Sequence, residues 1–337
     1  MKPAFLITID TEGDNLWGGP SQIATRNSQF LPRFQALCER FGFMPTYLTD
    51  YEMALCPVFT AFARDVLRRG AGEIGGHLHA WNTPPLRPLT ANDNACGPYA
   101  NEYPPELVAE KLSLLARLLA DTFQAPMTSH RAGRWGFDGS YARALAGLGY
   151  LVDCSVTPGV SWKASLGKPG GEGGPDYTGA PSEPYFVDFE DVTRPGASDL
   201  LELPVTILSL APRAIERLRR ALPERAIPRR VLNRLYPPHA WLRPDGKKRG
   251  RLLRVLDKAL RERRSYLEFM LHSSELMPGG SPAFPDRESI EALYRDLEAL
   301  FAAAAPRCRP STLTGFAREA WPSVRRADAL RSDSVIP

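Results

Sequence analysis

This 337-residue chain has few cysteines, no long apolar run and little net charge. Its five cysteines are scattered and form no CxxC pair, so the sequence signals neither a zinc ribbon nor a disulfide framework. No apolar stretch approaches the roughly 20 residues that a membrane-spanning helix needs. The first stretch, over 4–9, is also shorter than the apolar core of a signal peptide, which takes about 7–15 residues. We therefore expect a cytoplasmic protein, peripheral to the inner membrane face at most.

What is present is ordinary for a globular protein. Hydrophobic residues make up 43% of the chain and charged residues 24%, which excludes fibrous and wholly disordered classes. The 32 prolines and 27 glycines indicate long, shaped loops. The length fits two domains of about 150 residues each or one large α/β barrel.

Positive charge is concentrated in one part of the chain. Residues 213–264 contain 18 lysines and arginines but only five acidic residues, whereas the net charge of the whole chain is only +4. Such a stretch attracts anionic partners such as lipid headgroups or a phosphate-bearing substrate. No nucleic-acid-binding motif accompanies the charge, so we expect no nucleic acid partner. We expect residues 213–264 to contact an anionic membrane surface; the alternative is a solvated helical face without a partner.

Apolar strands alternate with amphipathic helices from the start of the chain. Continuous apolar runs such as 5–9 are typical of parallel strands that are buried on both faces. The alternation predicts a parallel α/β sheet or barrel. We expect strands over 5–9, 45–49, 72–75, 127–131, 150–155, 200–208 and 266–272, and helices over 28–41, 58–69, 139–148 and onward from 104 and 286.

The second half of the chain is less regular. Residues 165–184 hold six glycines and four prolines and predict a loop. The basic region predicts two or three short helices, which we interpret as an insertion over 209–264. The polar stretch 322–337 predicts a flexible tail. These patterns together predict one α/β domain over 1–321 that contains the basic helical insertion.

Polar clusters directly follow four of the predicted strands. The carboxyl ends of parallel strands meet at one edge of a sheet, where active sites gather. Four of the five histidines of the chain occupy such positions. The clusters are Asp10 to Asp14, His77 to His79, His130 to Trp135 and His272 to Glu275. This placement predicts one polar site that is built from distant parts of the chain.

The histidines and acids among these residues fit a metal site. Two imidazoles and one carboxylate, with an open position, form the usual catalytic arrangement for Zn²⁺ or a similar ion. His77 and His79 share a face if the backbone between them is extended, and Glu12 or Asp10 can supply the carboxylate. Asp14 stays open as a further ligand, a base or a turn residue. The alternative is a pair of loop histidines that bind nothing.

Motifs around the strand ends point to a known family. The segments that carry the likeness are Ile7-Thr-Ile-Asp-Thr-Glu-Gly13, Glu73-Ile-Gly-Gly-His77, His130-Arg-Ala-Gly-Arg-Trp135 and Phe269-Met-Leu-His272. They resemble the motifs of the NodB-like polysaccharide deacetylases, carbohydrate esterase family 4, and most of all the branch associated with lipopolysaccharide or O-antigen synthesis. In that family the second metal histidine falls four positions after His77, where this chain has Trp81, and we take His79 as its substitute.

The resemblance implies a fold, a cofactor and residue roles. The fold would be a distorted (β/α)7-type barrel of the polysaccharide deacetylase kind. The cofactor would be a divalent metal ion, Zn²⁺ first, with Co²⁺, Ni²⁺ and Mn²⁺ as alternatives. By position, the resemblance implies Asp10 as the general base, Arg131 as the arginine that orients it, His272 as the general acid, and Glu12, His77 and His79 as metal ligands.

Three further residues are candidates for substrate binding. Trp81 and Trp135 flank two of the motifs, and aromatic faces suit stacking on the C–H surfaces of a sugar. Arg134 suits a sugar phosphate or carboxylate. The alternative is that the two aromatic rings pack within loops.

The implied activity is hydrolysis of a non-peptide amide bond. We expect removal of an N-acetyl group from an amino sugar of a surface polysaccharide or lipopolysaccharide precursor, so that the partner is an acetamido sugar or glycan. Two alternatives stay open: a hydrolase of a small non-peptide amide on the same fold, with or without metal, and a non-catalytic glycan-binding relative.

Overall fold

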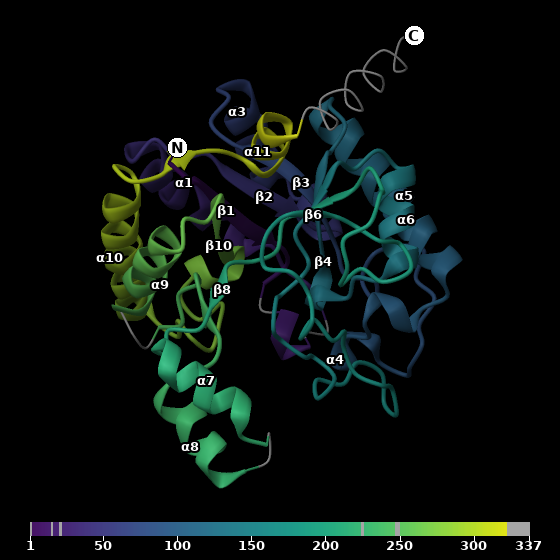
Figure 1. Ribbon diagram of the computed structural model, residues 1–337. Helices are drawn as coiled ribbons and strands as arrows, with labels where there is room; N and C mark the ends of the chain where they lie inside the picture. The colour runs from purple at the N-terminus through teal and green to yellow at the C-terminus, as the bar shows by residue number, and fades with distance from the viewer. Residues whose placement is uncertain (1, 15, 20–21, 224–225, 247–249, 322–337) are drawn as a thin grey trace.

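A mostly parallel sheet forms the centre of the molecule. The computed structural model describes residues 2–14, 16–19, 22–223, 226–246 and 250–321 (Figure 1). The predicted tail over 322–337 therefore lies outside the described residues. The sheet curls into a half-barrel with helices around it, which confirms the predicted barrel class.

Eleven strands are present among the described residues, and most of them belong to one sheet. They are β1 (Ala4–Thr11), β2 (Pro45–Thr49), β3 (Glu73–Leu78), β4 (Ser129–Ala132), β5 (Val152–Asp153), β6 (Tyr185–Phe186), β7 (Leu201–Glu202), β8 (Ile207–Leu208), β9 (Ala240–Trp241), β10 (Tyr266–His272) and β11 (Arg309–Pro310). The order in the main sheet is β10-β1-β2-β3-β4-β5-β7-β6, with β11 beside β1, and every pairing is parallel except that of β6 with β7. All eight residues of β1 are buried, as a continuous apolar run predicts for a central parallel strand.

A two-stranded ribbon continues the barrel wall between β7 and β10. β8 and β9 pair with each other and not with the main sheet. The Met270 N–H of β10 donates to the carbonyl of Leu242 at 3.3 Å, just after β9. The Glu268 N–H donates to Oγ1 of Thr206 at 2.8 Å. These two contacts hold the ribbon against β10, where a barrel would otherwise have a gap.

Most of the helices begin where the sequence supplies a capping side chain or a proline. Asp138 caps one helix through the Tyr141 N–H and Asp286 caps another through the Ser289 N–H, both at 2.8 Å. The helices are α1 (Leu31–Arg40), α2 (Tyr51–Leu55), α3 (Pro57–Arg68), α4 (Asp93–Cys96), α5 (Pro105–Phe123), α6 (Gly139–Gly147), α7 (Arg213–Ala221), α8 (Ile227–Leu235), α9 (Gly250–Arg261), α10 (Arg287–Ala304) and α11 (Leu313–Ala320).

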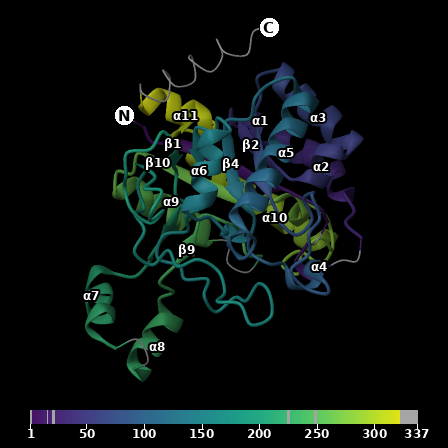
Figure 2. The same ribbon diagram turned by 90° about the vertical axis from the view of Figure 1, so that its right-hand side faces the viewer.

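The three helices of the basic region differ in their surroundings. α9 lies beside α10 in the body of the molecule and buries Leu252, Val255 and Leu256. α7 and α8 instead project away from the body, as Figure 2 shows from a second direction. In the described part of the chain, no helix combines the length and apolar composition that a membrane span requires.

Candidate metal and active site

Strand register brings the candidate residues to one edge of the sheet. Asp10 lies beside His272 across β1 and β10, and His77 lies beside Arg131 across β3 and β4. β3 runs three residues past its predicted end, so His77 lies within the strand and His79 directly after Leu78. The extended backbone turns both imidazoles to the same side, as the i, i+2 spacing predicts, with ring centroids 4.7 Å apart.

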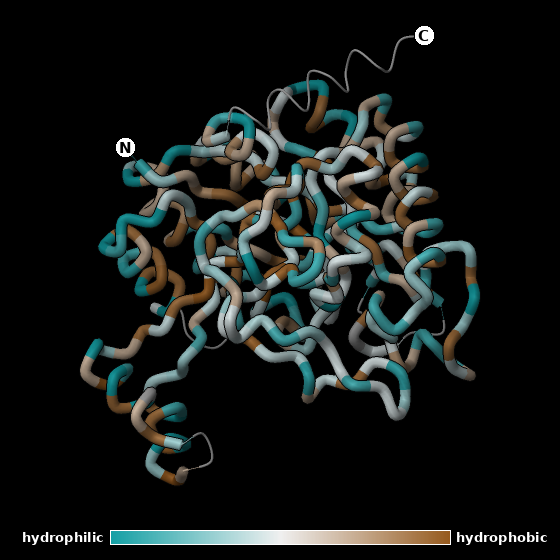
Figure 3. The backbone as a smooth tube through the Cα atoms, turned by 45° about the vertical axis from the view of Figure 1, so that its right-hand side comes forward, coloured by the Kyte–Doolittle hydropathy of each residue, from teal (hydrophilic) through white to brown (hydrophobic). Residues whose placement is uncertain are grey.

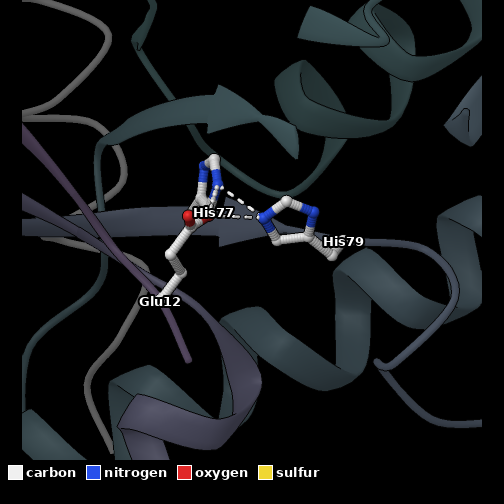
Figure 4. Close-up of side chains that lie close together, drawn as sticks. All are labelled: Glu12, His77 and His79. Carbon is white, nitrogen blue, oxygen red and sulfur yellow. Dashed lines mark hydrogen bonds and ion pairs between the residues drawn. The ribbon is translucent and has the colours of Figure 1, made fainter. Parts of the chain in front are cut away.

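Glu12, His77 and His79 converge, as Figure 4 shows. Nε2 of His79 lies 2.7 Å from Oε2 of Glu12 and 3.0 Å from Nε2 of His77. Nε2 of His77 lies 3.3 Å from the same Glu12 oxygen. All three side chains are buried. Burial alone would raise the pKa of Glu12, but the charge of His272 and hydrogen bonds from the two imidazoles lower it overall.

The donor set suits a divalent cation. Nδ1 of His77 lies 2.9 Å from the Arg131 carbonyl, and when it donates there it leaves an Nε2 lone pair facing Glu12. Nδ1 of His79 is buried and has no hydrogen-bond partner among the residues that the structure describes. Three donor atoms within 4.8 Å of one another, two nitrogens and one oxygen, match the two-histidine, one-carboxylate set that binds Zn²⁺. The residues present therefore fit the metal that the sequence motifs imply.

Asp10 is held beside this cluster by a buried arginine. Nη1 of Arg131 donates to Oδ1 of Asp10, and the Arg131 Nε donates to the Cys154 carbonyl at 3.1 Å. Burial alone would raise the pKa of Asp10, but the charges of Arg131, His77 and His272 lower it overall. Asp10 is therefore ionised at neutral pH, as a general base must be.

A second carboxylate holds the same arginine. Nη2 of Arg131 donates to Oε1 of Glu268 and, at 3.0 Å, to Oγ1 of Thr8. The guanidinium thus bridges Asp10 on β1 and Glu268 on β10. The sequence patterns did not single out Glu268. The signal was available, because an acid four residues before His272 in a buried strand shares its face.

His272 faces Asp10 on one side and a charged pair on the other. Its Nε2 lies 3.6 Å from Oδ2 of Asp10, and its Nδ1 lies 3.2 Å from Oε2 of Glu275. Nη2 of Arg243 lies 3.0 Å from the same Nδ1 and donates to Oε1 of Glu275 at 2.9 Å. Burial alone would raise the pKa of Glu275, but Arg243 and His272 lower it to about 2. Arg243 comes from the segment after β9, where no sequence pattern pointed to the site.

These groups open onto a cavity of about 430 Å³. Its lining includes the candidate base, the three candidate ligands and the candidate acid, together with aromatic and loop residues. The charged, histidine and aromatic side chains of the lining are Asp10, Glu12, His77, His79, Trp81, Tyr99, Arg134, Trp135, Trp162, Arg243 and His272. A cavity of this size, with several aromatic side chains and convergent charged groups in its lining, has the form of a small-molecule site.

The three predicted substrate residues all line the cavity. Trp135 stacks on Trp162, with centroids 6.4 Å apart, and Trp81 lies against the His79 ring. Arg134 lies over the Tyr99 ring, and its guanidinium donates to the carbonyls of Gly97 and, at 3.1 Å, Leu166. The guanidinium thus joins two loops of the cavity rim. Trp162 lies in a loop without periodic pattern, so sequence reasoning did not find it.

Two polar residues of the strand-end clusters have other partners. Asp14 accepts the Asn27 N–H and the Arg26 side chain, each at 2.9 Å, which makes it a turn residue of the loop after β1. His130 alternates with Arg131 along β4 and is fully buried, with its Nδ1 3.1 Å from Oδ2 of Asp153. Burial lowers the pKa of His130, so this ring is neutral.

Comparison with known proteins finds likeness at the level of structure. The sequence matches no protein-family model and no curated protein. A structure from Mycobacterium smegmatis assigned as a polysaccharide deacetylase superposes with a TM-score of 0.53 at 15% identity, covering 100% of this chain and 92% of that one. A Parabacteroides distasonis structure assigned as a glycoside hydrolase or deacetylase gives 0.51 at 13% identity, covering 98% of this chain and 72% of that one.

These values establish a common architecture over the full length of the chain. The parallel half-barrel and the strand-end site described above are arranged on that architecture. The chain therefore has the fold of the NodB-like polysaccharide deacetylases.

Proposed function

We propose that this chain is a metal-dependent N-deacetylase acting on an acetamido sugar of a surface polysaccharide or lipopolysaccharide precursor. One observation carries the proposal: a buried carboxylate base, a two-histidine, one-carboxylate cluster and a paired histidine line the same cavity. Neighbouring structures with this fold support hydrolysis of amide bonds in general. Zn²⁺ is the proposed ion, with Co²⁺, Ni²⁺ and Mn²⁺ as alternatives.

The mechanism follows from the positions of the polar groups. A divalent ion held by Glu12, His77 and His79 would polarise the acetyl carbonyl and make a water molecule more acidic. Asp10, ionised and fixed by Arg131, takes the proton of the attacking water as its oxygen bonds to the acetyl carbon. His272 gives a proton to the sugar nitrogen as the C–N bond breaks, releasing acetate and the free amine.

The supporting residues keep these two groups in place. Arg131 is fully buried and its side chain makes four polar contacts. Its guanidinium therefore holds the Asp10 carboxylate in a fixed orientation toward the cavity. Oε2 of Glu275 accepts a hydrogen bond from Nδ1 of His272. The other ring nitrogen, Nε2, then faces Asp10 and the substrate. Trp81 and Trp135 supply aromatic faces for the sugar ring.

The substrate would be met inside the cell. A cytoplasmic enzyme of this kind would act on nucleotide-linked or lipid-linked sugars at the inner membrane face. The basic region 213–264 suits a phosphate-bearing substrate or an anionic membrane surface.

Bound-metal stoichiometry together with acetate release tests the proposal. We expect the wild type, purified without an affinity metal, to hold about one ion per chain by elemental mass spectrometry. His77→Ala and His79→Ala should lose the ion, whereas His239→Ala, outside the cavity, should keep it. Asp10→Asn should keep the ion and lower kcat on acetamido sugars about 10²–10⁴-fold, because only the base is removed.

Other outcomes would favour a different ligand set or one of the two alternative functions. Loss of metal in His77→Ala but not in His79→Ala would remove His79 from the ligand set. Turnover of small amides with no bound metal, even after metal is added back, would favour a metal-free amide hydrolase. Binding of sugars without turnover would favour a glycan-binding protein.

A further inference from the structure

A pair of short helices projects from the barrel. α7 and α8 lie in the chain between the ribbon strands β8 and β9, and Figures 1 and 2 show them extending beyond the rest of the molecule. Arg219 is buried at their junction, where it donates to Glu216 at 2.5 Å and to the Tyr236 carbonyl. These contacts hold α7 against the residue that follows α8. We call the two helices together the α7–α8 hairpin (residues 213–236).

One face of α8 is apolar and exposed. Ile227, Val231 and Leu235 recur every four residues, so they share a face, and they are 74%, 51% and 67% exposed. Ten large hydrophobic side chains are at least 36% exposed in the described part of the chain, and five of them lie between 218 and 236. Figure 3 shows hydrophobic and hydrophilic positions alternating along this hairpin. Such a concentration of exposed apolar groups marks an interaction surface.

Arginines border the apolar face. Arg230 and Arg234 are exposed and lie one position before Val231 and Leu235, which places them along one side of the apolar face. Arg213 and Arg217 are exposed on α7. The hairpin sequence contains eight arginines and two glutamates. The partner must therefore be both anionic and able to receive apolar side chains.

The hairpin lies on the same side of the molecule as the cavity rim. α4 supplies part of the cavity lining, through residues 94–96. In both Figure 1 and Figure 2, α4 and the hairpin lie away from the N-terminus and α11, which mark the opposite end. A surface that receives the hairpin would therefore lie on the side of the cavity.

We propose that the α7–α8 hairpin is an interfacial anchor for an anionic phospholipid bilayer. The apolar face of α8 lies at the boundary of headgroups and acyl chains, and the bordering arginines contact lipid phosphates. A second copy of the chain fits this face less well, because pairing two α8 faces would bring Arg230 and Arg234 against like charges. The proposal assigns membrane contact to the first half of the basic region 213–264 only, because the apolar face of α9 in the second half is buried. It goes beyond the proposed chemistry and does not depend on it.

Sedimentation of the full chain with lipid vesicles tests the anchor. We expect the wild type to bind vesicles of phosphatidylglycerol and phosphatidylethanolamine but not of phosphatidylcholine alone, and to dissociate as salt is raised. A triple variant, Ile227→Ser, Val231→Ser and Leu235→Ser, should bind these vesicles with an affinity at least about tenfold lower than that of the wild type. The double variant Arg230→Glu, Arg234→Glu should lose about as much.

Matched variants elsewhere on the surface control for general effects. The double variant Leu55→Ser, Val58→Ser removes exposed apolar side chains from the body of the molecule. The double variant Arg68→Glu, Arg117→Glu reverses exposed charges there. Both double variants should bind vesicles as tightly as the wild type. Metal content and acetate release on a soluble substrate are measured in parallel, so failure of the anchor is distinguished from failure of the deacetylase. Absence of wild-type binding, equal losses in the controls, or a dimer that the triple variant dissociates would overturn the proposal.

Discussion

At the scale of single residues, Gly133 controls the position of a candidate metal ligand. A Cβ at this position would lie 2.6 Å from Nδ1 of His79 and 2.6 Å from the Leu78 carbonyl oxygen. The imidazole would have to leave its present position beside Glu12 and His77 to make room. We expect Gly133→Ala to weaken metal binding about 10–100-fold, measured by competition with a chelating dye.

Gly147→Ala is the matched control for this substitution. Apart from its chain neighbours and the backbone of its own helix, no heavy atom of the described residues lies within 4 Å of a Cβ built there, at the end of α6. An alanine in a helix is favoured over glycine by roughly 0.5–1 kcal/mol, so this variant should keep its metal and melt no lower than the wild type. Equal metal affinity in the two variants would show that His79 is not a ligand.

We expect His77, as a candidate metal ligand, to make metal retention depend on pH. Burial alone would lower its pKa, but the carboxylates of Asp10 and Glu12 raise it above the ordinary value of 6.5. A metal ligand needs a bare nitrogen, so protons compete with the metal beginning above pH 6.5 as the pH falls. We expect bound metal, followed by equilibrium dialysis, to decline on acidification and to recover when excess metal is added at the same pH.

Asp10 would give a different response to acid. Its pKa is lowered, so it stays ionised well into the acidic range. Activity lost at mildly acidic pH should therefore return with added metal. If excess metal leaves the acid limb of kcat/KM unchanged, protonation of a group other than the ligands controls the rate.

At the scale of elements, buried strands were predictable where the apolar run was unbroken. The predicted strands over 45–49 and 266–272 coincide with β2 and β10. The single strand predicted over 200–208 is instead β7 and β8, in two different sheets. Pro204 lies between them and has no N–H to donate to a ladder, so the strand ends before it. Apolar composition alone did not reveal that break.

In the candidate site, too, local sequence pattern revealed some residues and not others. The sequence could single out five candidates, Asp10, Glu12, His77, His79 and His272. Each lies within the last two residues of a strand or directly after it, where period-two alternation fixes the side-chain direction. Arg243 and Trp162 reach the cavity from irregular segments, and their positions depend on how distant loops pack. Reasoning from local periodicity has no access to such contacts.

At the scale of the whole molecule, we expect two neighbouring acids, the buried Asp50 and the half-buried Glu52, to make stability depend on pH. Asp50 accepts the N–H groups of Gly13 and Met53, which joins the loop after β1 to α2. Glu52 lies beside it and accepts from Asn82 at 2.9 Å. Burial, and the charge of Asp50, raise the pKa of Glu52 to about 9 from 4.5. The folded state therefore favours the protonated acid, so this contribution to stability is full below pH 4.5 and is lost as the pH rises toward 9.

Glu52→Gln removes the ionisation while keeping the shape and the hydrogen bonds of the protonated acid. The stability of the variant relative to the wild type should rise by about 1 kcal/mol for each pH unit between those two values, as measured by denaturant unfolding from pH 5 to pH 9. Glu110→Gln, on a half-exposed side chain of α5, should run parallel to the wild type throughout. A Glu52→Gln curve that also stays parallel would mean that the folded protein carries Glu52 ionised, with Asp50 holding the proton instead.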